Sequence, residues 1–378
     1  MHPLMTEDPV RLDAPEYPPG SAGCLDLALP HRPTGEPTVE TALSEILDRG
    51  AAIGTTLDPG YQRLWAELTA ASRGGKRVRP ALLEAGYRAW GGTDARAVSR
   101  LAAAIELMHT ALVIHDDVID GDERRRGRLN VSGWHAAQAR ERGTDPARAR
   151  EYGAAAGILA GDLALTGALR AVATCPAPTS TVHRLLDLFD LALHATAAGE
   201  LADVRLSLGV EAASVEETLL MAEHKTAVYS FALPLQAAAV LAEAPPAAVA
   251  AAGRTGRLLG TAFQLVDDLL GVFGDPTVTG KSRLSDLAAG KQTSLIVHAR
   301  STATWRLISR YVGDPALTEE QAVTVRALLQ ASGSRAFVEQ LAARQARQAV
   351  AAAEDAGLPA ELVCWLRSTT GDLLGRAA

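Results

Sequence analysis

The segment "ALVIHDDVIDGDERRRGR", residues 111–128, inserts charged residues into an apolar helical pattern. Just before it, Leu101, Ile105 and Met108 are spaced by threes and fours. That spacing predicts an amphipathic helix from about Ala97 to Asp120, with its apolar stripe in a core. A charged end on such a helix suggests that the core helix also carries a functional site.

The charged end of this helix is acidic. Asp116 and Asp120 are four residues apart and therefore share one helix face, with Asp117 beside them. His109 lies on the same side, seven residues before Asp116. Like charges one turn apart destabilise a helix by a few tenths of a kcal/mol per pair. Helix stability does not explain the pattern, whereas a bound cation would.

A second acidic pair is predicted on another helix, from about Thr255 to Phe273. Here Gln264, Asp267 and Asp268 form a polar face at offsets of three and four. Carboxylates arranged in this way suit Mg²⁺, which takes one or two of them together with phosphate oxygens and water. Either pair alone could be solvated helix surface. Two such pairs in apolar helices, each followed by a basic loop that contains glycine, favour a binding site.

The basic residues lie in short separate segments and suit a strongly anionic ligand, such as a diphosphate bridged by Mg²⁺. Arginine can bind phosphate oxygens through two parallel hydrogen bonds, and lysine supplies a mobile point charge. Each lysine alone could be a surface charge, and no P-loop follows a predicted strand. The segments are "GGKRVRP" with Lys76, Arg77 and Arg79, "RRRGR" with Arg124, Arg125 and Arg126, "HKT" with Lys225 and Thr226, and "TGKSRLSDLAAGK" with Lys281 and Lys291.

Composition favours a large helical core. Of the 378 residues, 48% are hydrophobic and only 4% aromatic, fewer aromatics than a sheet-rich core would use. The net charge of -7 argues against a nucleic-acid partner. Three scattered cysteines indicate a reducing compartment, and no apolar run reaches the ~18 uncharged residues of a membrane span. We therefore expect a cytoplasmic protein without a membrane span.

Proline and the absence of helical periodicity predict a flexible extension over residues 1–40. From residue 41 to 378 helical signals dominate, with breaks at "RGGKRVRP", "CPAPTS", "EAPP" and "GDPTVTGK". The two acidic motifs are about 150 residues apart and must converge if they bind one diphosphate. We therefore expect residues 41–378 to form one all-helical domain.

Between about residues 70 and 300 the sequence resembles the trans-isoprenyl diphosphate synthases, or polyprenyl synthetases. "GGKRVRP", "ELMHTALVIHDDVIDGDERRRGR", "GILAGDLAL", "HKT", "FQLVDDLLGVFGDPTVTGK" and "DLAAGK" occur in the order and spacing of that family. The resemblance implies an all-α helical bundle of the isoprenoid synthase type, with a central cavity for diphosphate and magnesium. It also implies a homodimer that condenses isopentenyl diphosphate with an allylic diphosphate.

The resemblance also implies roles for individual residues. Three Mg²⁺ ions would be held by Asp116, Asp117, Asp120, Asp267 and Asp268. The allylic diphosphate would be held by Arg125, Lys225 and Lys281, and isopentenyl diphosphate by Lys76, Arg79, His109 and Arg126. Thr226 and Gln264 would lie near the developing carbocation, and Lys291 would belong to the closing loop. The catalytic set would be Asp116, Asp120, Arg125, Lys225, Thr226, Gln264, Asp267 and Lys281.

One position departs from the family pattern. The second motif is often DDxxD in the family, whereas here it reads "DDLLG", with Gly271 last and Asp275 one turn further on. Asp267 would still bind magnesium, so the resemblance implies an active enzyme with an altered metal site. A class I terpene cyclase or a non-catalytic partner subunit is the alternative. The complete basic set disfavours a cyclase, and a partner subunit would be expected to lack an acidic motif.

Product length is predicted from the residue five before the first aspartate, which often limits chain growth in the family when it is aromatic. Here it is Ala111, about 7 Å along the helix from Asp116, with Leu112 beside it. A small side chain there disfavours ten- and fifteen-carbon products. Met108, a turn further along, would then set a twenty-carbon limit, as in a geranylgeranyl diphosphate synthase. Longer products remain an alternative, as does an Ala111 that only faces a neighbouring helix.

Overall fold

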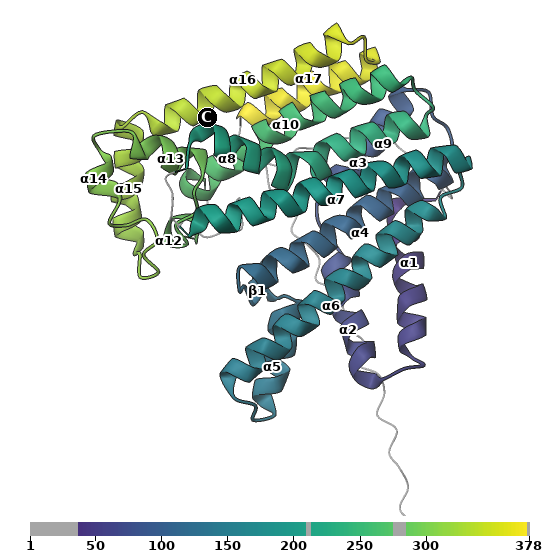
Figure 1. Ribbon diagram of the computed structural model, residues 1–378, viewed down its shortest axis with the longest axis horizontal. Coiled ribbons are helices and arrows are strands. Elements are labelled where there is room, and N and C mark those ends of the chain that lie inside the picture. The colour runs from purple at the N-terminus through teal and green to yellow at the C-terminus, as the bar shows by residue number, and fades with distance from the viewer. Residues whose placement is uncertain (1–36, 209–212, 275–284, 376–378) are drawn as a thin grey trace, which may run out of the picture.

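The computed structural model describes residues 37–208, 213–274 and 285–375, and this part of the chain is built from helices (Figure 1). Two strands of two residues each form a small hairpin. The all-α prediction is therefore confirmed. The first half contains α1 (Val39–Gly54), α2 (Pro59–Ser72), α3 (Val78–Ala89), α4 (Ala95–Ile119), β1 (Arg124–Arg125), β2 (Arg128–Leu129), α5 (Val131–Glu141), α6 (Pro146–Ala173) and α7 (Thr179–Ser207).

The second half continues the bundle, and its last long helices lie along one side of the molecule (Figure 1). It contains α8 (Val215–Ala222), η1 (Glu223–Ala232), α9 (Leu233–Leu241), α10 (Pro246–Phe273), α12 (Ser285–Ala288), α13 (Ser294–Arg300), α14 (Trp305–Ile308), α15 (Glu319–Ala331), α16 (Ser334–Asp355) and α17 (Ala360–Gly375).

The two helices predicted to carry the acidic motifs are both present. α4 matches its predicted range within two residues. α10 begins at Pro246 rather than Thr255, so the predicted start was wrong. The first turns of α10 are rich in alanine and lack the apolar stripe that marks a helix in sequence, although proline at the first position suits a helix start. The predicted extension lies almost entirely outside the described residues.

Small residues bring α4 and α6 close together. A Cβ at Gly161 of α6 would overlap the imidazole of His115, and one at Gly157 would overlap a methyl group of Val118. Alanines 156, 160, 164 and 168 of α6 are buried at intervals of four residues. Since glycine and alanine add little bulk, α4 packs tightly and its acidic end is held in place.

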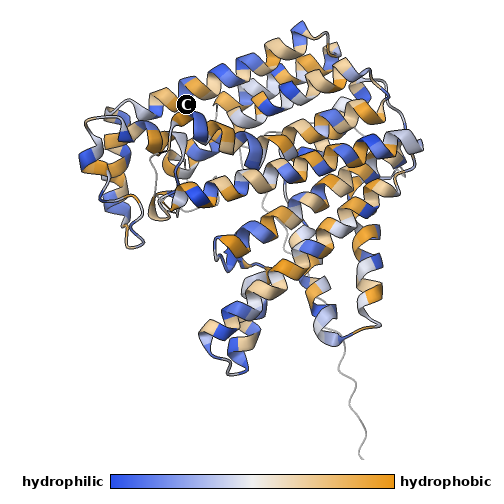
Figure 2. Ribbon diagram, viewed as in Figure 1, coloured by the Kyte–Doolittle hydropathy of each residue, from blue (hydrophilic) through white to orange (hydrophobic). Residues whose placement is uncertain are grey.

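Two described helices, α4 and α6, are long and apolar enough to cross a membrane. The most apolar window of α4 is 78% buried inside the protein, as a core helix requires, whereas that of α6 is 44% buried. The sequence predicts no membrane span, because its most apolar stretch, Gly157 to Val172, is interrupted by Asp162 and Arg170. Figure 2 shows apolar residues distributed over the helices of the bundle, with polar residues concentrated at several helix ends and in the α5 region.

A π-helix interrupts the continuous helix that runs from residue 215 to 241. Pro234, just after η1, has no N–H to donate to the carbonyl four residues earlier, which favours a break in the α-helical bonding. The wider π-helix fits because glycines face it. A Cβ at Gly199 of α7 would overlap the backbone nitrogen of Lys225, and one at Gly256 of α10 would overlap the backbone of Ala232.

Candidate active site

The first acidic motif forms the end of α4, and the β1–β2 hairpin folds Arg125 back onto it. Arg125 donates from Nε to Asp117 Oδ1 at 2.7 Å and from Nη2 to Asp116 Oδ2 at 3.0 Å. Arg126 adopts φ +53°, a left-handed conformation uncommon outside glycine, and Gly127 follows at φ +75°. This tight turn between the strands directs the arginine towards the carboxylates.

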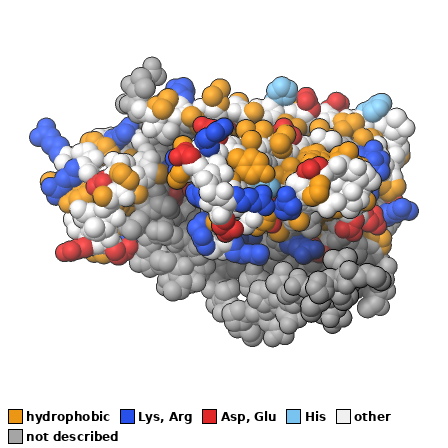
Figure 3. Space-filling model, turned by 90° about the horizontal axis from the view of Figure 1, so that it is seen from below, with side chains coloured by type: hydrophobic (Ala, Val, Ile, Leu, Met, Phe, Trp, Pro, Cys, Tyr) orange, Lys and Arg blue, Asp and Glu red, His pale blue; other side chains and the backbone are white. Residues whose placement is uncertain are grey.

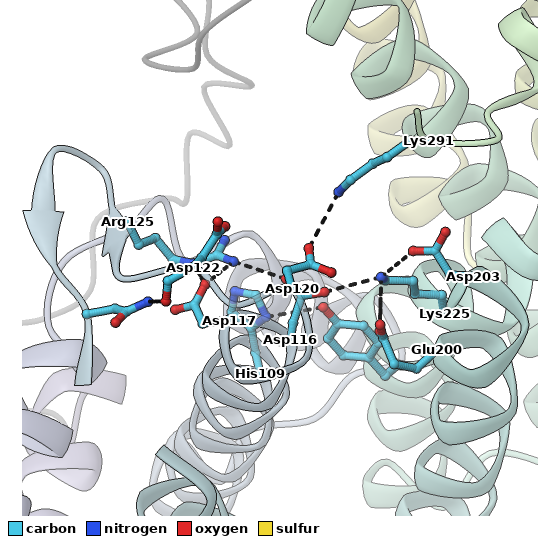
Figure 4. Close-up of polar contacts among 12 residues, drawn as sticks. His109, Asp116, Asp117, Asp120, Asp122, Arg125, Glu200, Asp203, Lys225 and Lys291 are labelled. Atoms are coloured by element: carbon cyan, nitrogen blue, oxygen red, sulfur yellow. Dashed lines mark hydrogen bonds and ion pairs between the residues drawn. The ribbon is translucent and has the colours of Figure 1, made fainter. Parts of the chain in front are cut away.

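Lys225 approaches the same motif from η1. Its Nζ lies 3.2 Å from Asp116 Oδ1, 3.0 Å from a carboxylate oxygen of Glu200 and 2.6 Å from Asp203 Oδ2 (Figure 4). Burial alone would lower the pKa of Lys225, but Asp203, Asp116 and Glu200 together raise it, so the amine stays charged. Carboxylates from α4 and α7 thus already surround one positive charge.

Lys291 reaches the motif from the C-terminal half, with Nζ 3.7 Å from Asp120 Oδ2 (Figure 4). Burial would lower its pKa, but Asp286 of α12 and Asp120 raise it. Burial raises the pKa of Asp120, and Lys291 partly offsets that rise. Lys291 therefore links the first acidic motif electrostatically to α12.

The second acidic motif lies near the end of α10. Gln264 Nε2 donates to Asp268 Oδ1 at 2.7 Å, which fixes the amide with its nitrogen towards the carboxylate. Burial raises the pKa of Asp268 to about 8, with further contributions from the charges of Asp267 and Asp286. A cation bound beside Asp268 would favour the ionised form of this buried carboxyl.

A second group of basic residues surrounds His109, on α4 two turns before the acidic motif. The hydroxyl of Tyr229 in η1 lies 3.2 Å from His109 Nδ1, and the two rings are stacked. The guanidinium of Arg79 lies over the Tyr229 ring, 5.0 Å from its centroid, and donates a hydrogen bond to Ser230 Oγ at 2.8 Å. Burial and the positive charges of Arg79, Arg126, Arg125 and Arg77 hold the pKa of His109 well below its usual value.

Arg77 has a structural role in the "GGKRVRP" motif. It donates to Glu106 Oε1 of α4 at 2.7 Å, to both oxygens of Glu40 in α1, and to the carbonyl of Ser72. Its φ of +49° continues a turn that begins at Gly74 and Gly75. These bonds fix the loop that carries Lys76 and the start of α3, which carries Arg79.

The structure brings most of the predicted residues into this region. Lys76 and Arg126 are exposed, and a Cβ at Gly75 would lie 3.6 Å from Arg126 Nη1, so the two basic segments are adjacent. Thr226 is half-buried next to Lys225 on η1. Lys281 and Asp275 lie outside the described residues. Figure 3 shows Lys and Arg side chains gathered near the middle of the face seen from below, although the chain as a whole is acidic.

The predicted chain-length residues all lie in or beside the main apolar core. Ala111 and Met108 are 0% and 1% exposed, and Leu112 packs against the same cluster. Their burial agrees with either a pocket for an apolar chain or simple packing against neighbouring helices. The twenty-carbon limit therefore stays a prediction.

Sequence reasoning missed four residues of the site: Glu200, Asp203, Tyr229 and Ser230. Glu200 and Asp203 stand three apart on the face of α7 that meets Lys225, and this pair was a readable signal. Tyr229 and Ser230 lay within an apolar run, and only the π-helix turns them towards Arg79.

The donor chemistry of the site fits magnesium. The carboxylates of Asp116, Asp120 and Asp267 are hard oxygen ligands on the two helices of the site. Over residues 37–208, 213–274 and 285–375, no three acidic, histidine or cysteine side chains form a complete metal site by themselves. Magnesium at a diphosphate site usually takes its remaining ligands from phosphate and water. The residues would therefore bind it together with an anionic substrate.

Comparisons with known proteins identify the family to which the chain is similar. The polyprenyl synthetase family model matches residues 64–328. A geranylgeranyl diphosphate synthase of Mycobacterium tuberculosis is 34% identical over 314 residues, which cover 80% of this chain and 83% of that protein. A (2E,6E)-farnesyl diphosphate synthase of Mycobacterium bovis is 32% identical, and the match covers 75% of each chain.

Among solved structures, the chain is similar to a geranylgeranyl pyrophosphate synthase from Corynebacterium glutamicum, determined in complex with isoprenyl diphosphate and magnesium. The TM-score is 0.82 at 29% identity, covering 89% of this chain and 97% of that one. Sequence, fold and site thus lead to one assignment: the chain belongs to the polyprenyl synthetase family, as a trans-prenyl diphosphate synthase.

Proposed function

We propose that this prenyltransferase condenses isopentenyl diphosphate with an allylic diphosphate to give geranylgeranyl diphosphate. The observation that carries the proposal is the arrangement around Asp116 and Asp120. Lys225 and Lys291 reach these carboxylates from other helices, and the Arg79–His109 group lies two turns away on the same helix. The two basic groups correspond to the two diphosphates of the reaction.

The first basic group, which consists of Arg125, Lys225 and Lys291, would hold the allylic diphosphate together with Lys281, which lies outside the described residues. Arg125, Lys225 and Lys291 stabilise the charge that accumulates on pyrophosphate as the carbon–oxygen bond breaks. Asp116, Asp120 and Asp267 would hold magnesium, with Asp117 and Asp268 beside them and three ions in total. When bound, the metal neutralises charge on the leaving group as a Lewis acid.

The carbocation side of the reaction falls to Thr226 and Gln264. Asp268 holds the amide nitrogen of Gln264, so the carbonyl oxygen of Gln264 is left to face the substrate. Oxygen dipoles stabilise the allylic cation without trapping it, provided that water is excluded. The double bond of isopentenyl diphosphate, held by Lys76, Arg79, His109 and Arg126, attacks this cation. The released pyrophosphate then takes up the proton.

Exposed apolar side chains support homodimerisation. Apolar side chains are exposed on α6 and α7, among them Ile158 at 48%, Leu159 at 56% and Leu191 at 64%. Neighbouring exposed apolar side chains of this size mark association surfaces. We propose that a second copy of the chain covers them and that the enzyme works in the cytoplasm, without a membrane span.

The test is product analysis by mass spectrometry. The protein is incubated with Mg²⁺, isopentenyl diphosphate and, separately, five-, ten- and fifteen-carbon allylic diphosphates. A linear twenty-carbon diphosphate is expected from each primer, and Ala111→Phe should shorten it. Products of twenty-five carbons or more would overturn the length assignment. A cyclic hydrocarbon formed without consumption of isopentenyl diphosphate would favour a terpene cyclase, and no turnover of any primer would favour a partner subunit.

A further inference from the structure

The second acidic motif lacks a carboxylate where helix geometry would place one beside Asp267. A residue four positions after Asp267 shares its face of α10, and that residue is Gly271. Gly271 is buried and adopts ordinary helical conformation, so the backbone gives no reason for glycine here. The reason must come from what packs against it.

The side chain of Asp286 occupies the space beside Gly271. A Cβ built at Gly271 would overlap Asp286 Oδ2, and Asp286 Cγ would lie 3.4 Å away. The Asp286 carboxylate, which comes from α12, therefore stands where a side chain at position 271 would begin. Glycine at position 271 avoids a steric clash with this carboxylate.

Asp286 is also tied to the rest of the site. Its carbonyl accepts a hydrogen bond from the backbone nitrogen of Lys291 at 3.1 Å, which closes the turn after α12. Lys291 in turn approaches Asp120 of the first motif. Asp286 therefore lies between the second acidic motif and the lysine that reaches the first.

We propose that Asp286 is a metal-binding residue that supplies, from α12, the carboxylate that the second motif lacks at Gly271. Asp267 and Asp286 then hold the cation on the α10 side of the pyrophosphate. The inference rests on the proposed function, in which Asp267 binds magnesium. The site thereby keeps a carboxylate beside Asp267 although the second motif ends in glycine.

The experiment measures binding of Mn²⁺, as a paramagnetic substitute for Mg²⁺, in the presence of inorganic pyrophosphate. Electron paramagnetic resonance reports free Mn²⁺ without any turnover. Asp286→Ala and the isosteric Asp286→Asn are expected to weaken Mn²⁺ binding about 10-fold or more. In the double variant Gly271→Asp/Asp286→Ala, a carboxylate returns from α10, and most of the affinity should return with it. Asp372→Ala, an exposed aspartate of α17, is the matched control.

Each outcome separates the inference from the proposed function. If Asp267→Ala loses Mn²⁺ binding while both Asp286 variants bind like Asp372→Ala, the inference is wrong and the metal role of Asp267 stands. If Asp267→Ala also binds normally, the metal assignment of the second motif is wrong. If Asp286→Ala weakens Mn²⁺ binding and the double variant does not recover it, then the Asp286 carboxylate does not replace one at position 271, and the inference is wrong.

Discussion

Asp116 contacts basic residues from two other elements of the site. It accepts from Arg125 of the hairpin at 3.0 Å and faces Lys225 of η1 at 3.2 Å. Each cation also has other carboxylate partners: Asp117 for Arg125, and Asp203 among others for Lys225. Removing Asp116 therefore leaves neither cation unpaired, and its effect on catalysis can be separated from its effect on stability.

For Asp116→Ala we expect condensation to fall by about 10²–10³-fold, because the change removes charge from the centre of the metal and diphosphate site. Thermal unfolding should stay close to that of the wild type. Steady-state turnover and calorimetry measure the two effects. Asp122→Ala changes an exposed aspartate two residues after Asp120, so it is the matched control and should retain activity. Wild-type turnover in Asp116→Ala would contradict the metal assignment.

His109 should make stability depend on pH. Burial and the surrounding guanidinium groups lower its pKa, so the neutral form is favoured in the folded state. Its contribution is fully present above the unfolded pKa of about 6.5 and is lost as pH falls through the folded pKa. The free energy of unfolding should decrease between pH 7 and pH 5 in the wild type. In His109→Asn that decrease should be smaller by on the order of 1 kcal/mol. Denaturant titrations measure this, with exposed His183→Asn as the control; equal slopes in all three proteins would refute it.

The π-helix η1 is the element that joins the two basic groups. It carries Lys225 towards Asp116 and, one turn on, Tyr229 and Ser230 towards His109 and Arg79. π-helical segments are rare and occur often at functional sites. The glycines of α7 and α10 that face η1 allow it to pack closely against both helices.

Gly199→Ala should therefore impair both stability and activity. Its Cβ would overlap the backbone of Lys225, which cannot move aside as a side-chain tip can. We expect a loss of about 1–3 kcal/mol in the free energy of unfolding and a fall in turnover of about 10²-fold as Lys225 shifts. Gly371→Ala on α17 is the matched control, because nothing lies within 4 Å of its Cβ. It should be slightly stabilising; unchanged turnover in Gly199→Ala would mean that η1 tolerates displacement.

At the scale of the whole molecule, the surface of α6 and α7 is the proposed interface of the dimer. α6 is apolar along its length, yet its most apolar window is only 44% buried within one chain. The corresponding window of α4, of similar hydropathy, is 78% buried. The difference leaves apolar side chains of α6 exposed, and these are the side chains that the proposed dimer would cover.

The wild-type enzyme is expected to sediment at twice its chain mass of 39.5 kDa. Ile158→Glu/Leu159→Glu should shift it to the mass of a single chain, because two charges would be buried without partners in the interface. Analytical ultracentrifugation measures this, and Val323→Glu, an exposed apolar position on α15, serves as the control. A dimer that persists in the α6 variant would place the interface elsewhere.

The helical class, the two acidic motifs and most of the basic residues could be predicted from the sequence, because spacing along a helix fixes which side chains share a face. The missing carboxylate at Gly271 could also be read from the sequence. The contacts between residues on different helices could not. Asp286 beside Gly271, Tyr229 against His109, and Asp203 against Lys225 lie between 15 and 120 positions apart in the chain. Such contacts depend on how helices pack, and packing is a property of all the helices together rather than of any one segment.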